Sequence, residues 1–160
     1  MTDNDVDELF RPNQLSLLES GLVGIGVNRR FGPDLDVPFG SVRFEAEAQL
    51  VRHFGLQHHW EVNLPVGFRF TPRRRLAGID SIGFGVGASF ASEIPPIELR
   101  RGRGSGAREL IYFHVELEHA LSAYPGTRVF FRVHHRSDGY GTVARAVGTN
   151  ALAIGIRRSF

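Results

Sequence analysis

Most of this chain alternates, residue by residue, between apolar side chains and polar or small ones. From Val42 to Leu50 the even positions are apolar and the odd positions are Arg, Glu or Gln. The same division runs from Trp60 to Phe70, and from Ile82 to Phe90 the odd positions are Gly or Ser. A period of two residues places one kind of side chain on each face of a β-strand. The chain is therefore predicted to be all-β.

Seven segments follow this pattern well. They are LVGIGVNRRF (22–31), SVRFEAEAQLVR (41–52), HWEVNLPVGFRF (59–70), SIGFGVGASF (81–90), RELIYFHVELEHAL (108–121), TRVFFRVHHRS (127–137) and NALAIGIRRSF (150–160). Residues 108–121 also fit an amphipathic helix, but the alternating neighbours and the Tyr-Pro-Gly turn that follows favour a strand. A doubtful first strand lies around Phe10 to Leu18.

Turn-forming segments separate the strands, including a low-complexity loop from Pro95 to Ala107. Short strands with such punctuation are typical of antiparallel barrels and sandwiches. We therefore predict an antiparallel eight-stranded up-and-down transmembrane β-barrel. The 160 residues form one domain, in which residues 1–20 are a poorly defined N-terminal segment that includes the doubtful strand.

Two kinds of barrel fit this alternation, and they differ in which face of the strands points inward. A soluble ligand-binding barrel has its apolar face inside, whereas an outer-membrane barrel turns that face to lipid. Opposite charges lie close together on the polar face, and aromatic residues such as Trp60, Phe70 and Phe90 lie toward strand ends. The chain also ends in an aromatic residue, Phe160, after an alternating strand. These features favour the membrane barrel.

The amino-acid composition excludes several kinds of site and partner. The chain has no Cys, which excludes disulfides, thiol catalysis and Cys-ligated zinc. The net charge is only +2, so nothing points to a nucleic-acid partner. The N-terminus, MTDNDVDELF, is acidic and is not a signal peptide, so an export signal is either missing from this sequence or the protein stays inside the cell.

Four segments together resemble a known family: FEAEAQLVRHFG, YFHVELEHAL, HHRSDGYG and GTNALAIGIRRSF. They are similar to segments of the lipid A 3-O-deacylases of the Gram-negative outer membrane (PagL-like proteins), and the resemblance extends from about Gly21 onward. It implies a location in the bacterial outer membrane, lipid A or lipopolysaccharide as substrate, and hydrolysis of the 3-O-linked acyl ester. It also implies a lipid-facing site made of a Ser nucleophile, a His base and an acidic third residue.

Strand parity assigns candidates to these roles. Val133, His135 and Ser137 share the apolar face of their strand, so His135 is placed to activate the hydroxyl of Ser137 for attack on an ester. Neighbouring His134 points into the interior. Where the family has a Glu, this chain has Thr149 and Asn150, and Asn150 falls on the same face as His135. An Asn carbonyl can orient the imidazole but stabilises imidazolium less than a carboxylate does.

Further candidates surround this site. The backbone N–H groups of Asp138 and Gly139 are expected to form an oxyanion hole. Arg100, Arg101 and Arg103, together with Arg108, are expected at the same end of the barrel, where they are placed to bind lipid A phosphates. No metal and no organic cofactor are expected. A lumen metal at His114, Glu116 and Glu118 is less favoured than an ion-paired network.

Three functions stay open at this point. The first is the lipid A esterase, the second is a related barrel that is catalytically inactive and has a structural or lipid-binding role, and the third is the soluble small-ligand barrel. The missing Glu motivates the second. Acyl-chain preference and oligomeric state, including a homo-oligomer, are not decided by the sequence.

Overall fold

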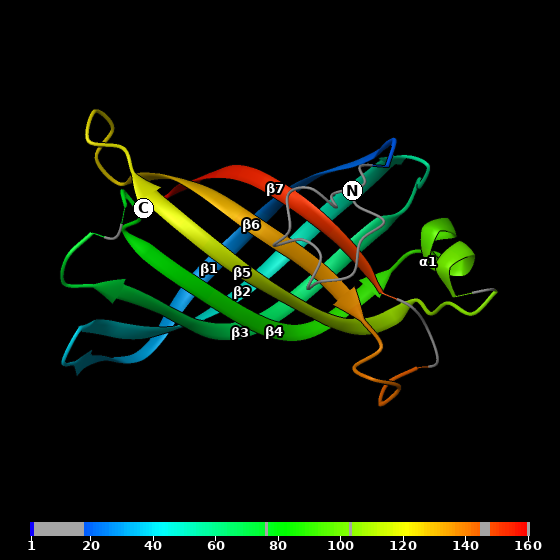
Figure 1. The fold of residues 1–160 in the computed structure, drawn as a ribbon, viewed down its shortest axis with the longest axis horizontal. Coiled ribbons are helices and arrows are strands. Elements are labelled where there is room, and N and C mark those ends of the chain that lie inside the picture. Colours follow the sequence, from blue (N-terminus) through cyan, green and yellow to red (C-terminus); the bar gives the residue numbers. More distant parts are fainter. Residues whose placement is uncertain (2–17, 76, 103, 145–147, 160) are drawn as a thin grey trace.

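The computed structural model describes residue 1 and residues 18–75, 77–102, 104–144 and 148–159. Seven strands follow one another along the chain: β1 (Ser20–Val37), β2 (Gly40–Gly55), β3 (Trp60–Pro72), β4 (Ser81–Ala91), β5 (Glu109–Ala120), β6 (Thr127–Ser137) and β7 (Thr149–Arg158). They form a single sheet in sequence order, and each strand is antiparallel to the next (Figure 1). All seven well-defined strands predicted from the alternation are confirmed, including the strand interpretation of residues 108–121.

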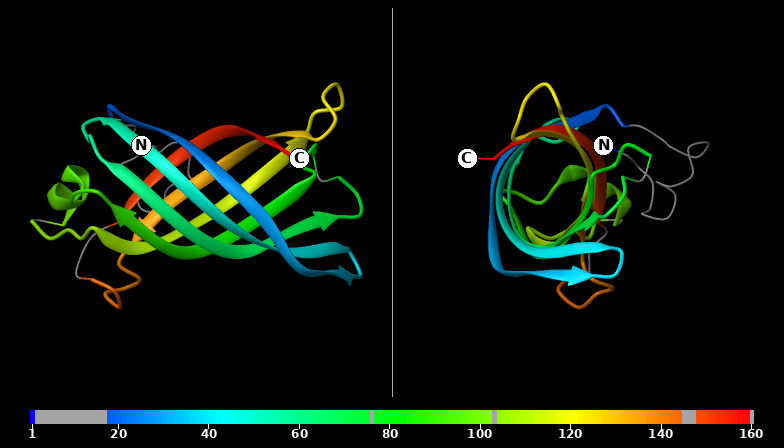
Figure 2. Two further views of the ribbon diagram at one scale, coloured as in Figure 1. Left: turned by 180° about the vertical axis from the view of Figure 1, so that it is seen from behind. Right: turned by 90° about the vertical axis from the view of Figure 1, so that its left-hand side faces the viewer.

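The sheet is strongly curled around a common axis (Figure 2). Its two edges are β1 and β7, and no ladder joins these strands in the described part of the chain. A cavity of about 890 Å³ lies along this seam, lined by residues of both edge strands and reaching inward to His134. The predicted first strand around Phe10 to Leu18 falls, apart from Leu18, outside the described residues, so the eighth strand stays a prediction.

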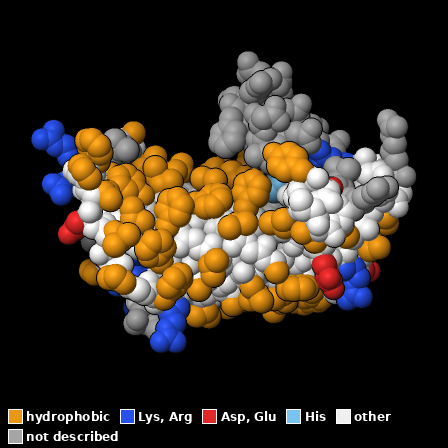
Figure 3. Space-filling model, turned by 90° about the horizontal axis from the view of Figure 1, so that it is seen from below, with side chains coloured by type: hydrophobic (Ala, Val, Ile, Leu, Met, Phe, Trp, Pro, Cys, Tyr) orange, Lys and Arg blue, Asp and Glu red, His pale blue; other side chains and the backbone are white. Residues whose placement is uncertain are grey.

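The outward face of the sheet is apolar and the inward face is polar. On β3, Trp60, Leu64 and Val66 are exposed, whereas Glu61 and Arg69 are buried. In Figure 3 hydrophobic side chains cover the middle of the visible surface, and charged side chains gather toward its two ends. A soluble barrel that holds an apolar ligand needs the opposite arrangement.

Ion pairs fill the middle of the interior. Glu116 on β5 accepts hydrogen bonds from Arg69 on β3 (2.6 Å), Arg132 on β6 (2.8 Å to Nε) and Arg157 on β7 (2.8 Å). Arg132 also reaches across to Glu47 on β2, at 2.9 and 3.0 Å. The network therefore links strands from opposite sides of the curled sheet. The predicted pairing of Glu116 with arginines is confirmed.

Glycines on β4 leave room for these interior side chains. A Cβ at Gly83 would lie 2.9 Å from the Arg69 guanidinium, and one at Gly85 would lie 2.6 Å from the His114 ring. Larger residues at these positions would displace charged or aromatic groups that cannot leave the interior. The glycine face of the SIGFGVGASF segment is therefore a packing feature.

The loop prediction for Pro95 to Ala107 needs a correction, because the segment contains a short helix, α1 (Pro96–Arg101). Proline at the first helical position suits a helix start. The helix also has side chains that anchor it, since Ile97 and Glu98 are fully buried. Arg100 and Arg101 occupy its last turn. Among the described residues, no helix is long and apolar enough to cross a membrane.

We predict that Glu116→Gln strongly destabilises the protein. The change removes the charge that the buried guanidinium groups of Arg69 and Arg132 and the partly buried one of Arg157 share, and breaking a buried ion pair on one side costs about 3–5 kcal/mol. Urea unfolding in detergent, followed by tryptophan fluorescence of Trp60, measures the loss. Arg74→Gln in the exposed β3–β4 turn is the matched control and should change stability by less than about 0.5 kcal/mol. Equal midpoints for Glu116→Gln and the wild type would contradict a structural role for the network.

Candidate active site

Strand β6 divides the four residues at its end between two faces. His134 and Arg136 point into the interior, where His134 Nε2 lies 3.0 Å from Glu61 and Arg136 pairs with Glu98 at 2.8 Å. His135 and Ser137 lie on the outward face. Ser137 is partly exposed, and His135 is nearly buried at 8% exposure, with the ring of Phe113 on β5 4.3 Å away. The division of this segment by parity is as predicted.

The β6–β7 register brings Asn150 to the histidine. His135 and Asn150 are directly opposite each other in the ladder, so their side chains share a face. The Asn150 Oδ1 atom lies 2.5 Å from His135 Nδ1. Because an amide oxygen only accepts, Nδ1 is the protonated nitrogen in this pair. The Nε2 atom then has the lone pair that a general base requires.

A tight turn follows the serine. The backbone N–H of Gly139 donates a hydrogen bond to Ser137 Oγ at 3.3 Å. Gly139 has a φ of +62°, and a Cβ there would lie 2.5 Å from Ile111 Cδ1, so this position requires glycine. The carbonyls of Asp138 and Gly139 accept from the N–H groups of Val143 and Thr142, which closes the turn. The Gly139 N–H is thus directed toward the predicted nucleophile.

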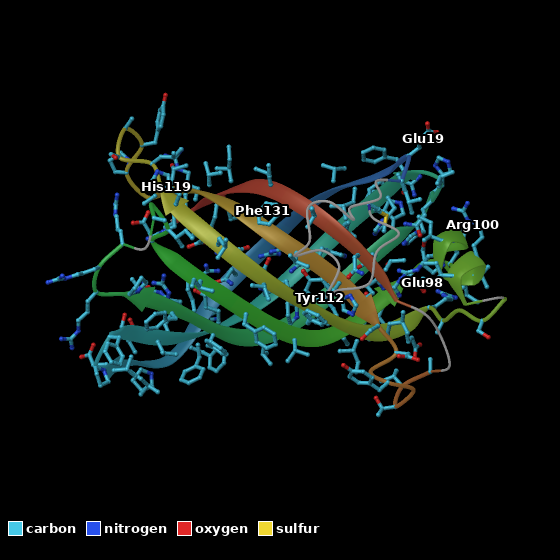
Figure 4. The ribbon with its side chains drawn as sticks, in the orientation of Figure 1. Glu19, Glu98, Arg100, Tyr112, His119 and Phe131 are labelled. Atoms are coloured by element: carbon cyan, nitrogen blue, oxygen red, sulfur yellow. The ribbon has the colours of Figure 1, made fainter. Side chains whose placement is uncertain are left out.

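Behind this site, on the interior side, lies a carboxylate that sequence reasoning missed. Glu98 of α1 is fully buried and bonds to Arg136 on β6 and to Thr149 on β7 (3.4 Å). Figure 4 shows Glu98 at the α1 end of the sheet, far from His119 at the other end. Burial raises the pKa of Glu98 to about 7, while Arg136 opposes the shift. Glu98 approaches Thr149, but Thr149 and Asn150 point to opposite faces, so Glu98 lies on the other face of the sheet from His135.

The structure places the predicted phosphate-binding arginines unevenly. Arg100 is exposed on α1, which lies near the end of β6, the strand that finishes at Ser137 (Figure 1). Arg101 is partly buried and donates a hydrogen bond to the carbonyl of Gly148, just before β7 (2.9 Å). Arg108 donates to the Ala91 carbonyl. Arg103 lies outside the described residues. Among the described members of this set, Arg100 and Arg108 are exposed, and Arg100 is the exposed one on the helix.

A second cluster was also missed, because its members come from three strands. His53 on β2, Glu61 on β3 and His134 on β6 meet in the interior, and all three are buried. Two pairs of adjacent histidines do not act as pairs. His58 is exposed while His59 is buried, and His134 points inward while His135 points outward, because successive residues of a strand point to opposite faces. Only the cross-strand register, which spacing along the chain does not reveal, could have identified this cluster.

Comparison with models of protein families, with curated proteins and with solved structures finds no match to this chain.

We predict that Glu98 makes stability depend on pH. A carboxyl whose pKa is higher when folded, about 7 against 4.5, contributes its full stability below about pH 4.5 and loses it as the pH rises through 7. The unfolding free energy of the wild type minus that of Glu98→Gln should therefore fall between pH 5 and pH 8, by on the order of 2 kcal/mol. Urea titrations of both proteins at several pH values measure this difference. A difference that stays constant with pH would show that Glu98 remains ionised in the folded protein.

Proposed function

We propose that this protein is a β-barrel of the bacterial outer membrane that hydrolyses the 3-O-linked acyl ester of lipid A. The observation that carries the proposal is the pairing of His135 with Asn150 on the outward face of the sheet, beside Ser137. The resemblance of HHRSDGYG and GTNALAIGIRRSF to the lipid A 3-O-deacylases supplies the substrate. We propose membership of that family as part of the same hypothesis.

The distribution of side chains supports the membrane part of the proposal. Large apolar side chains point outward on successive strands, including Ile25, Val66 and Ile154 at 55–78% exposure. Such a surface is costly in water and favourable in lipid. The interior, by contrast, is occupied by ion pairs and buried histidines. The described side chains that point into this interior are mostly charged or polar, which weakens the soluble-barrel alternative.

The proposed reaction follows the chemistry of serine esterases. His135 Nε2 takes the proton of Ser137 Oγ as that oxygen attacks the ester carbonyl of the acyl chain. The oxyanion that forms accepts a hydrogen bond from the Gly139 N–H, and we assign the Asp138 N–H as a second donor. Collapse of the intermediate expels the 3-oxygen of the sugar, which receives the proton from His135. Water then hydrolyses the acyl-enzyme by the same steps and releases the fatty acid.

Asn150 orients the imidazole during this cycle but carries no charge. It holds the Nδ1–H tautomer through its carbonyl oxygen and leaves the imidazolium form without a carboxylate partner. We therefore propose a slow esterase. No metal or organic cofactor takes part in this reaction scheme.

Lipid A and the surrounding outer-membrane lipid are the proposed partners, with no role for nucleic acid. We propose that Arg100 binds a lipid A phosphate at the end of the barrel that carries α1. Arg101 has a different part in the proposal, because its bond to Gly148 positions the start of β7 and thus Asn150. Arg103 is included on sequence grounds alone. A homo-oligomer is compatible with the proposal but is not required by it.

The proposal is tested by incubating lipid A with the full chain, refolded in detergent, and recording mass spectra of the lipid. The wild type should remove one 3-hydroxyacyl chain, and Ser137→Ala should remove none. Ser122→Ala, in the exposed β5–β6 turn at the opposite end, is the matched control and should retain full activity. Loss of the acyl chain that persists in Ser137→Ala would overturn the mechanism.

The main alternative is a barrel of the same family without catalytic activity, and the uncharged Asn150 is the observation that favours it. Complete absence of deacylation by the folded wild type would support this alternative.

The Asn150→Asp variant distinguishes a slow esterase from a protein without esterase activity. A carboxylate opposite His135 Nδ1 stabilises the imidazolium that develops in the transition state, so we predict a rise in kcat of at least about tenfold. Asn150→Ala should lower kcat, because it removes the group that orients the ring. Initial rates of fatty-acid release, measured under saturating substrate, provide the comparison. Equal rates for all three proteins would exclude Asn150 from the site.

A further inference from the structure

The interior cluster of His53, Glu61 and His134 lies close to the geometry of a metal site. His53 Nε2 is 2.8 Å from Glu61 Oε2, and His134 Nε2 is 3.0 Å from Glu61 Oε1. One nitrogen from each histidine and one carboxylate oxygen all lie within 4.8 Å of one another. Exposure of the three residues is 1%, 0% and 4%. Three potential ligands from three different strands thus converge in a space shielded from water.

The donor set selects the kind of ion. Two imidazole nitrogens and one carboxylate oxygen suit Zn²⁺ and similar first-row transition-metal ions, which bind such groups at about 2.0–2.2 Å. Calcium and magnesium prefer sites made of oxygen atoms. A small shift of the Glu61 carboxylate away from the two rings would open the central position. The three ligands would leave a fourth coordination position.

A third histidine, which lies beside the cluster, lacks a hydrogen-bond partner among the described residues. His59 is 1% exposed and stacks on His53, with ring centroids 4.1 Å apart. Within the described part of the chain, neither ring nitrogen of His59 has a hydrogen-bond partner, and the same holds for His53 Nδ1. Burial of these polar atoms without partners destabilises the folded protein. The rings of His59 and His53 are nearly parallel, at 12°, so the nitrogens of His59 do not point at the position between His53, Glu61 and His134, and His59 packs against the site as a neighbour.

Charge and access are also compatible with a cation. Arg136 approaches Glu61 to 4.0 Å, but it forms a closer ion pair with Glu98 at 2.8 Å. Arg136 is therefore held mainly by Glu98, and the carboxylate of Glu61 faces the two histidines. The cavity along the β1–β7 seam reaches His134, which provides a route from outside to the cluster.

We propose that His53, Glu61 and His134 bind a divalent transition-metal ion of the Zn²⁺ type, whose fourth coordination position stays open to a water molecule. The ion connects β2, β3 and β6 from inside. It lies on the face of β6 opposite to His135 and Ser137, so it takes no part in the proposed ester hydrolysis. The binding and the esterase can therefore succeed or fail separately.

The test uses the full chain, folded in detergent, without a histidine tag and freed of metal by a chelator. Titration with Co²⁺ should produce the visible absorption of a four-coordinate cobalt site at one ion per chain, and Zn²⁺ should displace it. X-ray absorption at the zinc edge should report imidazole ligands and no sulfur. Failure of the wild type to bind either ion, or binding without imidazole ligands, would overturn the proposal.

Variants locate the ion. His53→Gln and His134→Gln should each weaken binding by at least about 100-fold, since loss of even a supporting residue weakens metal sites by 10–100-fold. His58→Gln, which changes an exposed neighbour, is the matched control and should bind as the wild type does. A difference in electrophoretic migration between heated and unheated samples shows whether each variant is folded. Unchanged affinity in the folded His53→Gln variant would place the ion elsewhere and contradict the assignment.

Discussion

The arrangement of this protein depends on the buried ion pairs around Glu116. A carboxylate taken out of water needs partners at once, and here three guanidinium groups from β3, β6 and β7 supply them. Arg132 joins this carboxylate to Glu47 on β2. No flat sheet could bring these strands together. The buried charges can therefore find their partners only if the sheet curls, and the ion pairs in turn hold the sheet in its curled form.

The same requirement explains why two kinds of chemistry occur on neighbouring residues of β6. His134 and Arg136 face the ion-lined interior and are held by Glu61 and Glu98. His135 and Ser137 face outward and are held by Asn150 and the turn at Gly139. The interior contacts fix the strand, and the fixed strand orients the outward pair. A proposed lipid-facing site thus gains its rigidity from residues that never meet the lipid.

Sequence reasoning succeeded where alternation is strong. It predicted the seven strands, the placement of His134 inside and the common face of His135 and Asn150, because side-chain direction in a strand follows parity. It missed α1, since the segment from Pro95 to Ala107 is rich in Arg and Gly, while the helix is held by buried Ile97 and Glu98 and by the hydrogen bond of Arg101 to Gly148. It also missed the meeting of His53 with Glu61 and His134, whose separation along the chain conceals their proximity.

By itself, the sequence determined the period of the chain and therefore which side chains share a face. It could not determine which face is inside, because both kinds of barrel satisfy the same alternation. The tertiary structure decided this through the buried charges: they find partners only across the interior, so the apolar side chains are left outside. It also decided which residues meet across strands, because register depends on pairing partners far apart in the chain and not on local preference.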